Sequence, residues 1–233
     1  VKDVRDGSGC TPLFIAADMG HTRMVAFLLD RGALLDAVNQ HGETALYVSA
    51  LDGHVPVTKE LLRRGADTEA ADVNGQTPLM GAAQEGHTAI ITELIQFEAR
   101  IEAANNIGET PLMIASLEGY QNAVALLINN GADFNAARND GRTALHMAVM
   151  DGHVGVENVL LSAAEGQLKS MRRRRSRDLF LVSPLHLATD TQGETALHLA
   201  ARFRQVSTMQ LLLAYDSFFH EARRVSTIFG RLV

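Results

Sequence analysis

The sequence has 233 residues, of which 46% are hydrophobic and 5% aromatic, and its formal net charge is −6. This composition permits a buried core and, with few aromatic residues and abundant Ala and Leu, favours closely packed helices over an aromatic-rich β-sandwich. The single cysteine, Cys10, excludes an intrachain disulfide, and no apolar run approaches the roughly 18 residues that span a bilayer, so we expect no membrane insertion.

A string that begins with Thr recurs along the chain, each copy starting 33 residues after the previous one. The Thr hydroxyl suits a helix N-cap, and Pro, which follows Thr in several copies, suits the first helical position. A Gly nine residues after each Thr suits the left-handed residue that ends a helix of about two turns. The copies are TPLFIAA from Thr11, TALYVSA from Thr44, TPLMGAA from Thr77, TPLMIAS from Thr110 and TALHMAV from Thr143, and the glycines are Gly20, Gly53, Gly86, Gly119 and Gly152.

A second apolar stretch follows each short helix. In the first copy it runs from Arg23 to Arg31 and ends before Gly32, and a Gly recurs at the equivalent place as Gly65 and Gly131. In the third copy Glu98 takes this place, where Gly is preferred by on the order of 1 kcal/mol. About a dozen residues rich in turn signals, such as ALLDAVNQHGE after Gly32, lead to the next Thr. We expect each of these segments to project as a loop, termed a finger.

One such helix pair cannot bury its apolar face alone, so neighbouring pairs must stack around a continuous core. A fixed 33-residue period with Thr-Pro-Leu helix starts is typical of ankyrin repeats. From residue 6 to about residue 166 the sequence resembles the ankyrin repeat family. The resemblance implies an all-α solenoid of stacked helix-turn-helix units with projecting β-hairpin-like fingers. The five expected repeats lie at about residues 6–38, 39–71, 72–104, 105–137 and 138–166.

The regular spacing is lost after the fifth copy, and we expect the regular repeat geometry to fray from Gly166 onward. The string SPLHLAT from Ser183, which has the pattern of a helix start, is followed only 12 residues later by TALHLAA from Thr195, too soon for a second helix and a finger. A degenerate C-terminal cap and an imperfect gene model or fusion both fit this pattern. We expect a basic Arg-rich insertion, truncated and degenerate repeats, and a tail, at residues 167–182, 183–216 and 217–233, respectively.

The histidines do not predict a metal or catalytic site. Most occupy two positions of the repeat, and equivalent positions in stacked units lie about 10 Å apart, whereas zinc needs nitrogens at about 2.0–2.1 Å. We expect these residues to connect turns and helix starts: His21, His54, His87 and His153 at one position, and His146, His186 and His198 at the other. Cys10 has no basic environment, and no phosphate-binding Gly-rich motif is present, so we expect no enzyme activity, cofactor, metal or small-molecule substrate.

Charge is distributed unevenly. Residues 1–166 hold 10 Lys and Arg against 22 Asp and Glu, whereas residues 167–233 hold 11 against 5. The positive part contains the run Arg172, Arg173, Arg174, Arg175 and Arg177. A solvated loop, a nuclear-import or nucleic-acid patch, and a contact with the acidic repeats are all open interpretations of this run. Because no aromatic residues interleave with it, single-stranded nucleic acid is disfavoured as a ligand.

An acidic residue precedes the turn Gly in four consecutive repeats, and register places these carboxylates in a line along the inner face of the stack. They are Asp52, Glu85, Glu118 and Asp151, preceded by Leu51, Gln84, Leu117 and Met150. Such a row favours a basic or amphipathic partner. Acidic residues are also common at exposed helix ends, so a purely structural interpretation stays open.

In ankyrin-like proteins, the finger tips and first helices form a concave surface that binds other proteins. Carried over to the matching positions, this implies finger contacts at Gln40, His41, Val73, Asn74, Asn106, Ile107, Asn139 and Asp140. It also implies first-helix contacts at Tyr47, Leu51, Asp52, Met80, Gln84, Glu85, Met113, Leu117, Glu118, Met150 and Asp151. We expect Tyr47 and the methionines to act as apolar anchors and the carboxylates to select the partner.

The expected function is therefore that of a protein-interaction module, a scaffold or adaptor that binds another protein. Two alternatives stay open: a targeting or regulatory segment of a larger enzyme or channel, and a nuclear factor whose basic tail touches nucleic acid. The first residues, VKDVRDGSGC, lack the apolar core of a signal peptide, so we expect a cytoplasmic or nuclear location. Because the chain begins with Val1, we expect a fragment or a processed form.

Overall fold

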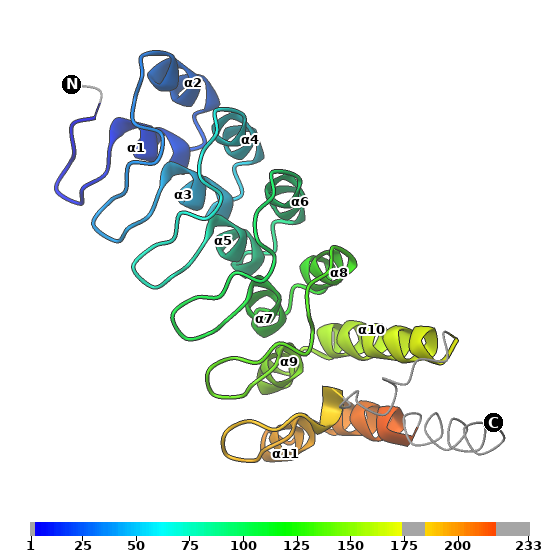
Figure 1. Cartoon of the computed structure of the whole chain (residues 1–233). Helices are drawn as coiled ribbons and strands as arrows, with labels where there is room; N and C mark the ends of the chain where they lie inside the picture. The colour runs from blue at the N-terminus through cyan, green and yellow to red at the C-terminus, as the bar shows by residue number, and fades with distance from the viewer. Residues whose placement is uncertain (1–2, 174–184, 218–233) are drawn as a thin grey trace.

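Short helices follow one another in pairs in the computed structural model, which describes residues 3–173 and 185–217, and the pairs stack into one array (Figure 1). The inner helices are α1 (Pro12–Asp18), α3 (Ala45–Leu51), α5 (Pro78–Gln84), α7 (Pro111–Leu117), α9 (Ala144–Asp151) and α11 (Ala196–Arg202). The outer helices are α2 (Thr22–Asp30), α4 (Val55–Arg63), α6 (Thr88–Gln96), α8 (Gln121–Asn129) and α10 (Val154–Arg173), and residues 206–217 are also helical. The predicted all-α solenoid is confirmed.

The recurring Thr residues begin the inner helices as N-caps. Thr44, for example, has extended backbone angles, and its Oγ1 accepts a hydrogen bond of 3.1 Å from the backbone N–H of Tyr47. In α9 and α11 the cap is reciprocal, because Nδ1 of His146 or His198 accepts from the backbone N–H of the capping Thr. A helix cap of this kind stabilises a helix by about 1 kcal/mol, which matters for helices of two turns.

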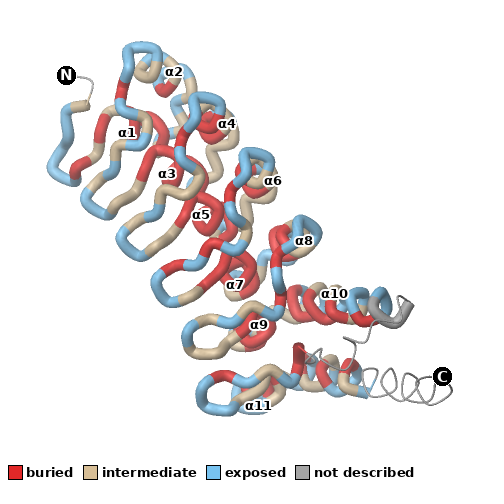
Figure 2. Tube along the Cα trace, viewed as in Figure 1, coloured by how far each residue is buried: buried red, intermediate tan, exposed pale blue. Residues whose placement is uncertain are grey.

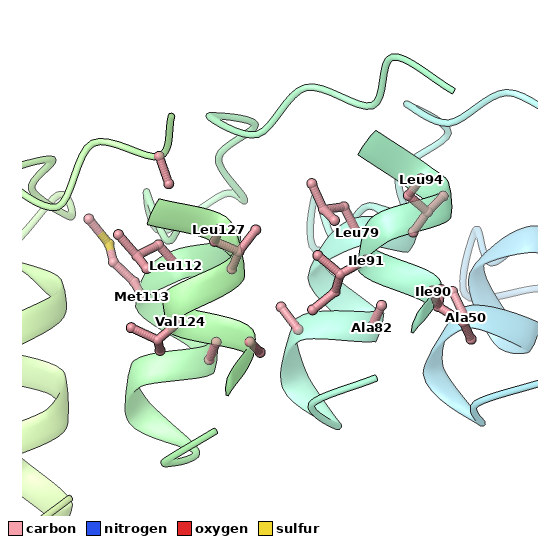
Figure 3. Packing of buried hydrophobic residues seen from close by; sticks show 14 of the residues in the cluster. Ala50, Leu79, Ala82, Ile90, Ile91, Leu94, Leu112, Met113, Val124 and Leu127 are labelled. Atoms are coloured by element: carbon pink, nitrogen blue, oxygen red, sulfur yellow. The ribbon is translucent and has the colours of Figure 1, made fainter. Parts of the chain in front are cut away.

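The core is a continuous seam between the inner helices and the facing sides of the outer helices (Figure 2). Figure 3 shows Leu79 of α5 with Ile91 and Leu94 of α6, and Leu112 of α7 with Leu127 of α8. These five side chains are fully buried. Burial of each contributes roughly 1.5–3 kcal/mol. Because the same core cluster continues from one pair into the next, the stacked pairs stabilise one another in a way that a single pair could not.

The fingers are built from tight turns, with one isolated β-bridge, between Ala137 and Thr143, among the residues described. Backbone hydrogen bonds join each finger to the one before it. The N–H of Val73 donates to the carbonyl of His41 at 2.9 Å, and the N–H of Asn106 donates to the carbonyl of Asn74, also at 2.9 Å. The fingers therefore form a continuous edge along the array rather than separate loops (Figure 1).

Glu98 has a φ of 64°, so a side chain occupies the left-handed helix end where its equivalents Gly65 and Gly131 have φ values of 85° and 98°. The repeat register predicts Glu98 at this helix end, and the structure agrees. Arg204, with a φ of 58°, takes the left-handed turn of the last helix pair in the same way. Non-glycine residues in this region are uncommon and strained, so both positions reduce the stability of their units.

The C-terminal part departs from the regular repeat. The outer helix α10 continues past Gly166 to Arg173, so it is longer than the other outer helices, and Leu168 on this extension is buried. The prediction that the string from Ser183 begins a first helix was wrong for the described part of that string, because Leu185–Leu187 is a single 3-10 turn. This turn lies just before a finger whose Thr191 N–H donates to the carbonyl of Asp140 at 2.8 Å.

The string therefore occupies the stretch between an outer helix and the next finger, and α11 with the helix over residues 206–217 forms the pair that follows. A helix-start composition alone therefore does not show whether a segment forms a first helix or the connection before a finger. Ser183, the arginines Arg174, Arg175 and Arg177, and the predicted tail beyond residue 217 lie outside the described residues.

Candidate functional site

Four exposed carboxylates, termed the acidic row, stand at equivalent places in successive repeats: Asp52, Glu85, Glu118 and Asp151. The first three are the C-cap residues of α3, α5 and α7, and Asp151 is the last residue of α9. The C-terminus of a helix carries a partial negative charge, so an acidic residue there is disfavoured by roughly 0.3–1 kcal/mol. Helix stability therefore gives no reason for four such residues in a line.

A neighbouring carboxylate raises the negative potential at one end of the row. Burial raises the pKa of Asp52 first, and the charge of Asp18 from the preceding repeat raises it further. His54 and His87 act in the opposite direction and lower it. A cation placed beside Asp52 and Asp18 would relieve their repulsion, so this end favours a basic group.

Beside the acidic row lie Leu51, Gln84, Leu117 and Met150, which are half-buried. Leu117 and Met150 also pack against the core, so only part of each side chain is available to a partner. The carboxylates and these partly exposed apolar groups alternate along one side of the array. The combination suits a partner that presents both cationic and apolar side chains.

Three predicted anchors are not on the surface. Tyr47, Met80 and Met113 are all buried, Met80 completely. Burial also raises the pKa of Tyr47 to about 12, with smaller contributions from the charges of Asp72 and Glu43. The prediction that they supply contact area was wrong because their position on the inner helix faces the neighbouring repeat: Tyr47 Cε2 would lie 3.4 Å from a Cβ added to Gly81 of the next inner helix.

The predicted finger residues are placed at the tips, but several of their side chains are already engaged. Amide groups donate to the preceding finger, Gln40 to the carbonyl of Gly7 at 2.9 Å and Asn106 to that of Val73 at 3.0 Å. The amide of Asn139 does the same towards Asn106 at 3.2 Å. Exposed tip residues are Gln40, His41, Val73, Asn74, Asn106, Ile107 and Asn139, whereas Asp140 is half-buried. Val73 and Ile107 are thus the apolar groups that the tips offer.

An ion-pair network at the later fingers was not predicted. Arg138 pairs with Glu109 of the preceding finger and with Asp140 of its own, both at 2.8 Å. Arg142 lies 3.6 Å from Asp190 of the following finger. The signal that could have revealed it is the residue five before each Thr, which is Asp or Asn in the other fingers and Arg138 in this one. The network fixes Asp140, so this carboxylate is less available to a partner than the acidic row.

Two of the histidines that were expected to connect turns and helix starts, His54 and His87, have that role in the structure. Nε2 of His54 lies 2.7 Å from the carbonyl oxygen of Asp18, and Nε2 of His87 lies 3.0 Å from that of Leu51. Each carbonyl belongs to the inner helix of the preceding repeat. Within residues 3–173 and 185–217, no three His, Cys, Asp or Glu side chains are grouped to hold a metal ion.

Among the same described residues, no helix is both long enough and apolar enough to cross a membrane. Comparison with known proteins gave one family. A family model described as ankyrin repeats (3 copies) matches residues 1–72, 53–138, 107–173 and 136–223. No curated protein matches the sequence.

Proposed function

The chain belongs to the ankyrin repeat family, and we propose that it binds a basic, amphipathic segment of a partner protein along the acidic row and the adjoining finger tips. Ankyrin repeats are generally protein–protein interaction modules and are typically non-catalytic. The proposal adds the place of binding and the character of the partner. The role is that of a scaffold or adaptor, in which affinity and positioning are the whole mechanism.

The observation that carries the proposal is the acidic row itself, four exposed carboxylates in register at helix C-termini. Since carboxylates at this end of a helix oppose the helix dipole, their repetition supports a role in binding rather than in helix stability. In a line, their potentials add, so they attract a cationic partner and accelerate its association.

Apolar contacts would supply the rest of the affinity. The half-buried Leu51, Leu117 and Met150 lie beside the row, and Val73 and Ile107 are exposed at the finger tips. Charges at the rim of an interface mainly set the rate and choice of encounter, whereas desolvated apolar groups slow dissociation. A partner segment with cationic groups on one side and Leu-type groups on the other would match both features.

The test compares two charge-reversed variants of the full chain. In the row variant, Asp52, Glu85, Glu118 and Asp151 are changed to Lys. The matched control reverses the same number of acidic residues on the outer helices, namely Asp30, Glu60, Glu93 and Glu165. The control acids make solvent-accessible ion pairs, which contribute only about 0–1 kcal/mol each. Both variants therefore have the same net charge, and neither removes a buried partner.

The ligands are synthetic helical peptides of Leu and Lys, with a Leu and Glu peptide of the same pattern as the negative ligand. We expect the Lys peptide to bind the wild type and the control at least about tenfold more tightly than the row variant at low salt, because reversal turns attraction into repulsion. A pull-down with the same three proteins then identifies cellular proteins that bind the wild type and the control more strongly than the row variant. Equal binding of the Lys peptide by the row variant and the control would refute the acidic row as the recognition surface.

A further inference from the structure

At the positions of Ile15 and Met24, the first repeat exposes apolar side chains where every later repeat buries the equivalent residue. Ile15 of α1 is 43% exposed and Met24 of α2 is 49% exposed. Phe27, one turn after Met24 and therefore on the same side of α2, is also exposed. These three residues define the α1–α2 end face, at the N-terminal end of the array (Figure 1).

The equivalents of Ile15 show what normally covers this position. They are Val48, Ile114, Met147 and Leu199, and each is at most 7% exposed. In the third repeat the position is Gly81, and a Cβ added there would lie 3.5 Å from the Cβ of Leu51 in the preceding inner helix. This position therefore faces the preceding repeat, and its burial requires one.

The equivalents of Met24 lead to the same conclusion on the outer helices. They are Val57, Ile90, Ala123, Val156 and Thr208, and each is at most 1% exposed. The contact can be seen directly at Thr208, whose Oγ1 donates at 2.9 Å to Oε1 of Glu157 in the preceding outer helix. Met24 thus occupies a place that, in all later pairs, lies against the outer helix of the repeat before it.

The register of the array extends through the first finger to Asp3. In later repeats, a carboxylate accepts a hydrogen bond from the backbone N–H of the residue 31 positions further along the chain. Asp36 accepts from the N–H of Asp67 at 3.1 Å, and Glu69 accepts from the N–H of Arg100 at 2.8 Å. Asp3 accepts from the N–H of Leu34 at 2.9 Å in the same way. The backbone at Asp3 therefore follows the path that, in the later units, leads directly from the preceding outer helix.

We propose that the α1–α2 end face is the docking surface for a further helix pair of the array's own kind, joined in register ahead of Asp3. The occupant would present what the existing pairs present to their successors. At the inner helix these are the residues equivalent to Tyr47 and Leu51, which are Met113 and Leu117 in α7. At the outer helix it is the residue equivalent to Glu157, which is the apolar Val124 in α8. The inference rests on the interfaces that repeat within the array and is independent of the proposed function.

The test adds a pair in register and asks whether it covers Met24. Residues 102–134, which contain α7 and α8, are placed directly before Asp3 in place of the first two residues. The readout is the rate at which peroxide oxidises each methionine in the folded protein, measured by peptide mass spectrometry. Met19 is the internal control, since it is exposed but stands at the position of the acidic row, which stacking leaves uncovered.

We expect oxidation of Met24 to slow by at least about tenfold in the fusion, because it then requires local opening of the stack, while Met19 keeps its rate. A fusion carrying Met24→Glu should lose most of the gain in unfolding midpoint that the added pair confers, whereas the same change in the 233-residue chain should leave its midpoint nearly unaltered. Equal Met24 oxidation with and without the added pair would overturn the proposal.

A second copy of the chain is the other occupant to be tested. Sedimentation equilibrium of the 233-residue protein would then give a dimer that Met24→Glu dissociates. That result would assign the face to self-association and would also overturn the proposal. A monomer whose Met24 is oxidised at a rate independent of protein concentration is the result that supports it.

Discussion

Nε2 of His87 lies 3.0 Å from the carbonyl oxygen of Leu51, so the start of α6 is hydrogen bonded to the end of α3 in the preceding repeat. The imidazole also lies against Gly53, where an added Cβ would stand 2.7 Å from Cε1 of His87. Gly53 has a φ of 79°. The recurring Gly and His are therefore one interaction across two repeats: Gly allows the left-handed turn and the approach of the ring, and His satisfies a carbonyl that the helix leaves unpaired.

Replacing His87 with Ala removes this hydrogen bond and leaves the Leu51 carbonyl without its imidazole partner. We expect the free energy of unfolding to fall by about 1–2 kcal/mol. Urea denaturation measures the change, with His41→Ala, on an exposed finger tip, as the control that stays within about 0.5 kcal/mol of wild type. Similar losses in both variants would mean that the inter-repeat hydrogen bond contributes nothing specific.

Glu98→Gly should stabilise the protein. The backbone of Glu98 lies in the left-handed region, and removing its Cβ relieves strain of about 1 kcal/mol, which the larger entropy of unfolded Gly offsets only in part. The thermal midpoint reports the gain. Gly65→Ala at the equivalent position is the matched control and should have the opposite sign, since its φ is 85° and an added Cβ there meets no neighbour. An unchanged or lower midpoint for Glu98→Gly would contradict this account.

Asp72→Ala should loosen the third finger. Oδ1 of Asp72 accepts from the N–H of Asn74 at 2.8 Å and from that of Gln76 at 2.7 Å, so the substitution leaves both donors without this acceptor. We expect a loss of about 1–2 kcal/mol and faster hydrogen exchange at these two amides. Val73→Ala, on the same finger, should leave both exchange rates as they are. Unaltered exchange in Asp72→Ala would show that the finger does not depend on this carboxylate.

Glu157→Gln should make stability less dependent on pH. Glu157 is fully buried, and burial raises its pKa above the ordinary value of 4.5, although Thr208 and His153 lower it in part. Because the folded-state pKa exceeds the unfolded one, its contribution is fully present below about pH 4.5 and is lost as the pH rises through the folded-state pKa. The variant should therefore match the wild type at pH 4 and exceed its thermal midpoint at pH 7.

The control for that series is Glu165→Gln, a half-exposed residue of α10 that pairs with Lys169. Its midpoint should follow the wild type at both pH values, since exposed ion pairs contribute little. A Glu157→Gln variant that is less stable than wild type at pH 7 would contradict this expectation. It would show that interactions in the folded state outweigh the cost of burying the ionised carboxylate.

The exposed part of the candidate site was largely predictable, whereas the buried part was not. The acidic residue before each turn Gly is necessarily at the end of an inner helix, so the exposure of Glu85 or Glu118 followed from the helix boundary. Tyr47, Met80 and Met113 lie within the same helices, where the facing direction depends on the neighbouring repeat. Their shared register position, occupied by large side chains in successive copies, was a sign of burial.

The C-terminal part also combines a feature that the sequence predicts with one that only the tertiary structure decides. The string from Ser183 has a helix-start composition, and only the hydrogen bond from Thr191 to Asp140 assigns its stretch to the approach of a finger. The sequence by itself determined the period, the caps and the left-handed turns, because these depend on residues within a few positions of one another. The tertiary structure decided which side chains are covered and which end face is left open, since burial depends on the repeat stacked alongside.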